Sequence, residues 1–136
     1  MRKLMTAALV LVTTAVLMGM GSLGGAPEGE VPKTDENIKV QLTDRSGMKV
    51  ELTRFSMNGK VFLEGKRGAG DMSVFFHDLK EIGFGPVSGD TVPGDLLLKS
   101  GRHLQLNIRT GAVFHGDTGE GAYQISASDV SRIQIH

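Results

Sequence analysis

The chain has 136 residues, 15 basic and 15 acidic side chains and no cysteine, so its formal net charge at pH 7 is zero. With no excess of basic residues, the chain lacks the composition of a protein with the basic surface that nucleic-acid phosphates require. This argues against a nucleic-acid partner. Without cysteine the protein forms no disulfide, no thiolate metal site and no lipid-modified cysteine.

The N-terminus has the pattern of a secretory signal peptide. Two basic residues, Arg2 and Lys3, precede an apolar run over residues 4–18, and small residues follow it. The run is shorter than the roughly 20 residues that a membrane-spanning helix needs. We therefore expect residues 1–24 to be a cleaved signal peptide, with no transmembrane span after its removal. The mature protein is then periplasmic or secreted.

A polar segment follows the signal. Residues 27–37 contain two prolines and several acidic side chains, with Val31 as the one large apolar residue. We predict a disordered linker over residues 25–37. The remaining residues, 38–136, have the usual length of one domain with one core.

Short apolar segments with turn residues between them fill this domain. Ten segments alternate as strands do, and no window longer than one turn has helical periodicity with caps. The predicted strands are residues 38–43, 49–56, 60–64, 72–76, 80–84, 95–99, 102–108, 112–115, 123–126 and 130–135. The sequence therefore predicts an all-β domain, either barrel-like or a two-sheet sandwich, because such arrangements protect strand edges.

The two halves of the domain resemble each other. The stretch "GKRGAG" from Gly65 and the stretch "GDTGEG" from Gly116 lie 51 positions apart, and the apolar positions after them also match. We predict two tandem β-meander repeats, residues 38–84 and 95–136, joined by residues 85–94 and related by pseudo-twofold symmetry.

The second half also resembles a β-repeat of exported bacterial proteins of unknown function. The stretch "LLLKSGRHLQLNI", a hairpin and then "GDTGEGAYQISASDVSRIQI" give an L-x-x-G strand pair, a G-x-T-x-x-G turn and a closing strand. The resemblance covers most of the chain after residue 38, although Arg67 stands in the first half where Thr118 stands in the second. It implies an architecture and no particular reaction.

Strand parity predicts the core. Side chains at alternating apolar positions of each strand would point inward. They are Val40, Leu42, Val50, Leu52, Phe62, Val74, Phe76, Leu79, Ile82, Phe84, Leu96, Leu98, Leu104, Leu106, Ile108, Phe114, Ile125, Val130, Ile133 and Ile135. Phe75 has the opposite parity. It would either contact a partner or be covered by residues 83–95, and the sequence leaves both alternatives open.

The recurring glycines do not form a phosphate-binding loop. A dinucleotide loop leads into a helix, whereas these glycines lead into strands, where they would allow positive φ and close backbone approach. Asp78 and Asp129, at matching corners, are interpreted as capping residues in preference to a carboxylate pair. Ser73, His77 and Asp78 lack the surroundings of a catalytic triad.

One hairpin offers candidate metal ligands. If residues 109–111 form a three-residue tip, His103 faces Asp117 and His115 faces Gln105 on the outer side of the 102–117 hairpin. Two imidazoles and a carboxylate could then bind a divalent metal, although such residues are also typical of a solvated strand face.

We therefore expect an exported, non-catalytic β-module that binds a protein or another envelope component, or has a structural role there. It is not an enzyme and needs no cofactor. The alternative is a metal-binding or small-ligand protein that uses His103, His115 and Asp117.

Overall fold

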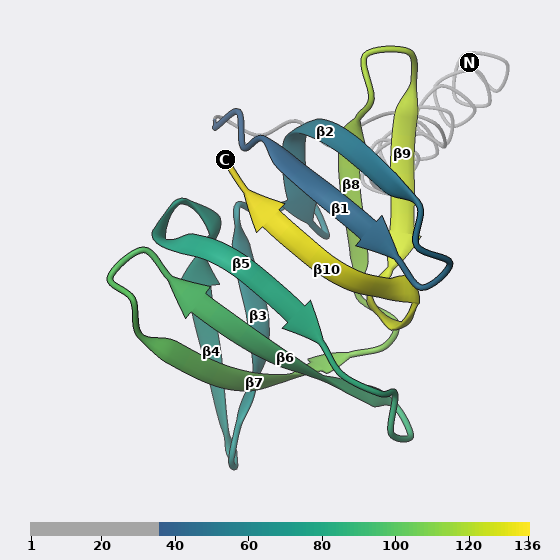
Figure 1. The fold of residues 1–136 in the computed structure, drawn as a ribbon. Coiled ribbons are helices and arrows are strands. Elements are labelled where there is room, and N and C mark those ends of the chain that lie inside the picture. Colours follow the sequence, from purple (N-terminus) through teal and green to yellow (C-terminus); the bar gives the residue numbers. More distant parts are fainter. Residues whose placement is uncertain (1–35) are drawn as a thin grey trace, which may run out of the picture.

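The computed structural model describes residues 36–136, which form an all-β domain (Figure 1). The strands are β1 (Val40–Asp44), β2 (Lys49–Met57), β3 (Phe62–Arg67), β4 (Gly70–Phe75), β5 (Leu79–Phe84), β6 (Thr91–Leu98), β7 (His103–Arg109), β8 (Val113–Asp117), β9 (Ala122–Ser126) and β10 (Val130–Ile135). Two single-turn 3-10 helices, η1 (Phe76–Asp78) and η2 (Ala127–Asp129), precede β5 and β10. Each predicted strand is present within a few residues of its expected bounds, so the all-β prediction is confirmed.

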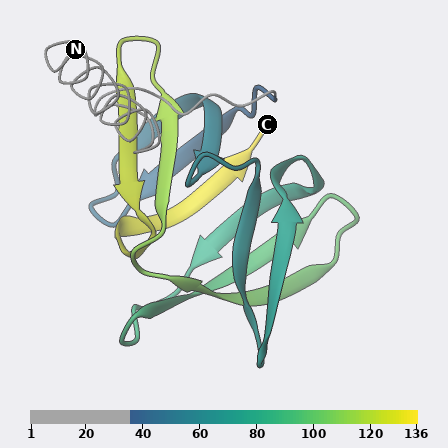
Figure 2. The same cartoon turned by 180° about the vertical axis from the view of Figure 1, so that it is seen from behind.

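The strands form one antiparallel sheet that curls into a half-barrel (Figures 1 and 2). Their order in space is β4-β3-β7-β6-β5-β10-β1-β2-β8-β9. Curling lets one sheet cover both sides of a single core. The strands at its two ends, β4 and β9, each have one neighbour among the described residues.

When each of β1 to β5 is exchanged with the strand five places later in the chain, the result is the same strand order read from its other end. Hydrogen bonds correspond in the same way. The Phe76 N–H donates to the Val61 carbonyl at 3.1 Å, and the Ala127 N–H donates to the Ala112 carbonyl at 2.8 Å. A tandem repeat would produce such correspondences, but the predicted twofold relation between the halves stays a prediction.

The two halves exchange their hairpins. The β3–β4 hairpin pairs with β7 of the second half, and the β8–β9 hairpin pairs with β2 of the first half. Our expectation that β7 and β8 form a hairpin is therefore wrong. The turn after β2 has a positive φ at Asn58 and at Gly59, but β2 already lies between β1 and β8, so β3 does not pair along it.

The buried core follows the predicted pattern with one exception and several additions. Every predicted inward residue except Phe62 is buried or packs against the buried cluster. In β3 the inward residue is Leu63, because the strand runs from residue 62 to 67 with the opposite parity. Phe55, which is not among the predicted inward residues, is fully buried, because Arg54 has a φ of 53° and the register of β2 shifts there. The Phe55 ring lies 5.0 Å from Phe76 and 5.4 Å from Phe114.

The recurring glycines are structural, as predicted. The φ angles of Gly68 and Gly119 are 62° and 91°, so each permits a hairpin turn. A Cβ on Gly65 would lie 2.9 Å from the Leu106 Cβ, and one on Gly116 would lie 2.8 Å from the Leu52 Cβ. These two glycines let each hairpin approach the strand of the other half.

The corners before β5 and β10 are not capped by carboxylates, and that interpretation is wrong. Asp78 and Asp129 are the last residues of η1 and η2, and the residues at the N-caps make no side-chain cap hydrogen bond. The shared contact is through the backbone. The carbonyls of Asp78 and Asp129 accept the N–H groups of Lys99 and Arg45, each at 2.9 Å.

The end of the predicted linker contacts the domain. Asn37 Oδ1 accepts the Arg54 N–H at 2.9 Å, which satisfies the backbone at the β2 bulge. Glu36 lies 3.4 Å from the His77 ring nitrogen. The predicted signal peptide and the rest of the linker lie outside the described residues. Between residues 36 and 136, no helix is long and apolar enough to span a bilayer.

Candidate functional site

The predicted metal ligands lie on separate parts of the sheet. His103 on β7 faces Leu97 of β6, and its ring lies 3.5 Å from the Asp95 carboxylate. His115 lies on β8, which has β2 and β9 as its neighbours. The expected facing of His103 and Asp117 is therefore wrong, because it required β7 and β8 to pair.

His115 and Asp117 share one side of β8. Burial lowers the pKa of His115, which favours the neutral imidazole at pH 7. His115 faces Ser56, whose buried hydroxyl oxygen has no hydrogen-bond partner among residues 36–136. No three His, Asp or Glu groups in that part of the chain are placed to hold a metal ion. Metal binding by His103, His115 and Asp117 stays a prediction.

Phe75 points away from the core, as its parity predicts, and is 48% exposed. The 83–95 connection therefore does not cover it. The Phe75 ring stacks on His77 at 5.2 Å and meets Phe62 edge to face at 5.8 Å. The Lys60 ammonium lies 5.6 Å from the centre of the Phe62 ring. We call Phe62, Phe75 and His77 the aromatic row.

The aromatic row borders the end of the sheet. Beyond β4 no strand follows among the described residues. The Phe76 N–H donates to the Val61 carbonyl, toward β3. The Glu64 N–H donates away from β4, to the Met57 sulfur at 3.3 Å. Both bonds indicate the same alternation along β3: its even-numbered residues turn their N–H and C=O groups away from β4, and its odd-numbered residues turn them toward β4.

This alternation shows which backbone groups of β4 lie on the side where no described strand pairs with it. In an antiparallel pair, alternate residues turn their N–H and C=O groups toward opposite neighbours. On β4 the groups of Asp71, Ser73 and Phe75 therefore turn away from β3. The side chains of the same three residues lie on the outer face, opposite Lys66, Glu64 and Phe62 in the β3 register.

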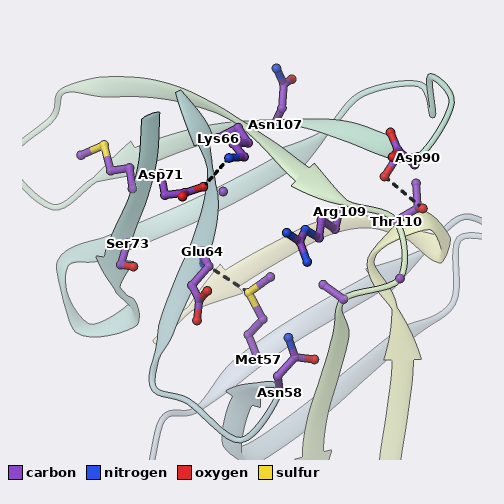
Figure 3. Close-up of a pocket in the computed structure, with 14 residues that line it drawn as sticks. Met57, Asn58, Glu64, Lys66, Asp71, Ser73, Asp90, Asn107, Arg109 and Thr110 are labelled. Carbon is purple, nitrogen blue, oxygen red and sulfur yellow. Dashed lines mark hydrogen bonds and ion pairs between the residues drawn. The ribbon is translucent and has the colours of Figure 1, made fainter. Parts of the chain in front are cut away.

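A cleft of about 610 Å³ lies over the same hairpin (Figure 3). Its walls are the outer side of β3 and β4, the turn after β2, the end of β7 and the turn that follows β7. Side chains that line it include Asn58, Glu64, Lys66, Asp71 and Arg109. Figure 3 shows the Arg109 side chain directed into the cleft.

Two acidic groups in the cleft already have cationic partners. Glu64 pairs with Lys60 at 2.7 Å, and Asp71 pairs with Lys66 at 2.8 Å. The hydrogen bond and positive charge of Lys66 lower the pKa of Asp71, and the charge of Arg109 lowers it further. Asp71 is therefore ionised at neutral pH.

Arg109 differs from the lysines of the cleft, because within residues 36–136 its guanidinium makes no hydrogen bond or ion pair. The turn beside it is fixed, since the N–H and hydroxyl of Thr110 both donate to the Asp90 carbonyl, at 2.9 and 3.2 Å. Across the cleft, Asn58 Oδ1 accepts the Val113 N–H at 3.0 Å. Within the described part of the chain the Asn58 NH₂ group has no acceptor of its own, so it is available as a donor.

Sequence reasoning did not find this cleft. Its walls come from both halves and meet only because the β3–β4 hairpin pairs with β7. The one signal in the sequence was Arg109, a charged residue at a predicted turn, and charged residues are ordinary in turns.

Residues 34–136 match the model of a family described as "Uncharacterised protein", and the chain belongs to this family. A protein of Aquifex aeolicus (strain VF5), described as "Uncharacterized protein", is 32% identical over 107 residues, which are 79% of this chain and 80% of that protein. No solved structure matches the chain.

Proposed function

We propose that this chain, as a member of that family, is an exported, non-catalytic β-module that binds an extended segment of a partner protein along the free edge of β4. The observation that carries the proposal is an edge of β4 that no strand within residues 36–136 pairs with, beside an exposed aromatic row. Backbone pairing at an edge supplies affinity, and exposed side chains beside it supply specificity.

The edge of β4 has few of the features that block strand addition. Natural proteins protect edges with charges, prolines or bulges. The outward residues of β4 are Asp71, Ser73 and Phe75, and only the first is charged. Its carboxylate is already paired with Lys66. A partner strand could therefore pair with the edge from Ser73 to Phe75 and bury part of the Phe75 ring.

Export supports the same proposal from the sequence. A signal-like N-terminus would place the domain outside the cytoplasm, where a small β-module could attach to an envelope protein. The absence of a recognisable catalytic motif in the sequence favours binding over catalysis.

The test uses a random 12-residue peptide library panned on the full chain, followed by affinity measurements on the selected peptides. Replacing Ser73 by proline removes an N–H at the free edge without removing a β3–β4 hydrogen bond. We expect Ser73→Pro to weaken peptide binding at least tenfold, or about 1.4 kcal/mol. Ser73→Ala, which keeps the N–H, should change it less than about twofold.

The matched control is Gln124→Pro at the equivalent place on β9, the other end of the sheet. It should leave peptide binding unchanged. Circular dichroism of each variant checks that the fold is kept. If the selected peptides bind Ser73→Pro as well as the original chain, or depend on Gln124, the β4 edge is not the binding site.

A further inference from the structure

One cation of the cleft beside β4 makes no side-chain ion pair or hydrogen bond within residues 36–136. Lys60 and Lys66 are each paired with a carboxylate within the hairpin. Arg109 is directed into the same cleft and has no such partner within residues 36–136 (Figure 3). A guanidinium presents several N–H donors in one plane, and this geometry matches an oxyanion.

A second donor lies across the cleft from Arg109. The Asn58 side chain is held by its oxygen, which accepts the Val113 N–H at 3.0 Å, and this leaves its NH₂ group to donate. Backbone contacts hold the Asn58 side chain and the turn that follows Arg109. The β2–β3 turn holds Asn58, and the bonds from Thr110 to the Asp90 carbonyl hold the turn after Arg109.

We propose that this cleft is a binding site for a small organic monocarboxylate, with the carboxylate on Arg109 and Asn58. The proposal goes beyond peptide binding at the β4 edge and does not depend on it. The remainder of the ligand would lie against the apolar parts of Met57, Met72 and Ala112, which also line the cleft.

Charge favours a carboxylate over a phosphate. Glu64, Asp71 and Asp90 all line the cleft, and the lining cations are Lys66 and Arg109. A singly charged carboxylate would pair with Arg109 and add one negative charge to the cleft. A phosphate dianion would bring a second negative charge close to the three carboxylates, where it is repelled.

The test is a titration of the full, isotopically labelled chain followed by ¹H–¹⁵N NMR. The probes are 4-phenylbutyrate, which has one carboxylate and an apolar tail, its neutral amide 4-phenylbutyramide, and inorganic phosphate. We expect 4-phenylbutyrate to shift the amide signals of Asn58 and Arg109 with a dissociation constant below about 1 mM. The amide and phosphate should bind at least about tenfold more weakly.

Three variants assign the effect to Arg109. Arg109→Gln should weaken 4-phenylbutyrate binding at least about tenfold, because it removes a charged hydrogen-bond donor. Arg109→Lys, which keeps the charge but loses the planar geometry, should have an intermediate effect. Arg102→Gln removes an equal charge from an exposed loop outside the cleft and should change the affinity less than about twofold.

Each contrary result overturns the proposal. No shift at 10 mM probe, shifts mapped outside the cleft, or equal losses in Arg109→Gln and Arg102→Gln would show that no carboxylate site exists there. Tighter binding of phosphate would show that the ligand class is wrong. The Arg109 side chain is exposed and makes no ion pair within residues 36–136, so its replacement should leave the fold intact, and the melting temperature of each variant verifies this.

Discussion

The two hairpins at the ends of the sheet, β3–β4 and β8–β9, share an architecture and differ in surface. Both have a glycine with positive φ in the turn and a second glycine against a leucine of the other half. Their outward residues have little in common. The first hairpin carries paired charges and the aromatic row, and the equivalents of Ser73 and Phe75 in the second are Gln124 and Ser126.

This difference separates structure from candidate function. The shared glycines maintain the exchanged pairing between the halves, so they are expected at both ends whatever the protein binds. Features present at one end only are not required by the architecture. The aromatic row belongs to this second group, since Gln124 and Ser126 stand where Ser73 and Phe75 do, and for this reason we place the proposed peptide site beside it.

The largest expected effect tests what the hairpins share. Gly65→Ala and Gly116→Ala each place a Cβ within 3.0 Å of a leucine Cβ, so the strands must move apart. We expect each variant to lower the free energy of unfolding by about 1–3 kcal/mol. Urea denaturation measures both values. A loss at one end only would show that the two hairpins do not pack in equivalent ways.

Matched glycines provide the control for that experiment. A Cβ on Gly70 would meet its nearest atom at 3.7 Å, and one on Gly121 would meet none within 4 Å. Gly70→Ala and Gly121→Ala should leave stability unchanged or raise it by up to about 1 kcal/mol.

A smaller effect separates the two hairpin turns. Thr118 Oγ1 accepts the N–H groups of Glu120 and Gly121 at 3.2 and 3.1 Å, whereas Arg67 at the equivalent place makes no side-chain hydrogen bond or ion pair within residues 36–136. We expect Thr118→Ala to cost about 0.5–1.5 kcal/mol and Arg67→Ala to cost almost nothing. Thermal unfolding of the two variants measures the difference, and equal melting temperatures would contradict it.

The smallest effect concerns the loops after β1 and β6. The side-chain hydrogen bond from Ser46 is the largest cause that lowers the pKa of Asp44, and backbone N–H groups add to it. Because the folded pKa is lower than the unfolded one, Asp44 stabilises the protein above pH 4 and loses this effect as the pH falls through the folded pKa. Asp44→Asn should therefore lower the melting temperature at pH 7, with a difference that shrinks below about pH 4.

The equivalent loop after β6 has no carboxylate in this role. There the Ser100 hydroxyl accepts the Arg102 N–H at 3.5 Å. Ser100→Ala should have the same small effect at pH 7 and at pH 3. If the Asp44→Asn difference did not change with pH, the Asp44 carboxylate would not be responsible for it.

Local patterns predicted most of the secondary structure. Strand alternation located all ten strands, and glycine spacing located the turns at Gly68 and Gly119. The prediction of inward-facing residues from strand alternation failed at two places. Nothing in the sequence showed that Arg54 would adopt a positive φ and turn Phe55 inward, and the length of the turn before β3 decided whether Phe62 or Leu63 faced the core.

The candidate site was less predictable, because it depends on pairs of residues far apart in the chain. Phe75 could be found from parity alone, since one strand determines which side it faces. Arg109 and Asn58 could not, because the cleft between them exists only when β3 of the first half pairs with β7 of the second. The predicted facing of His103 and Asp117 failed for the same reason, because it required β7 and β8 to be neighbours.

The sequence by itself determined the all-β class, the positions of the strands and turns, and nearly all of the core, because alternation and turn chemistry act over a few residues. Only the tertiary structure decided which strands are neighbours. Both edges of a strand can accept hydrogen bonds, and the choice between them depends on which pairing lets the sheet curl around one core. That choice exchanged the hairpins, exposed the edge of β4 and formed the cleft at Arg109.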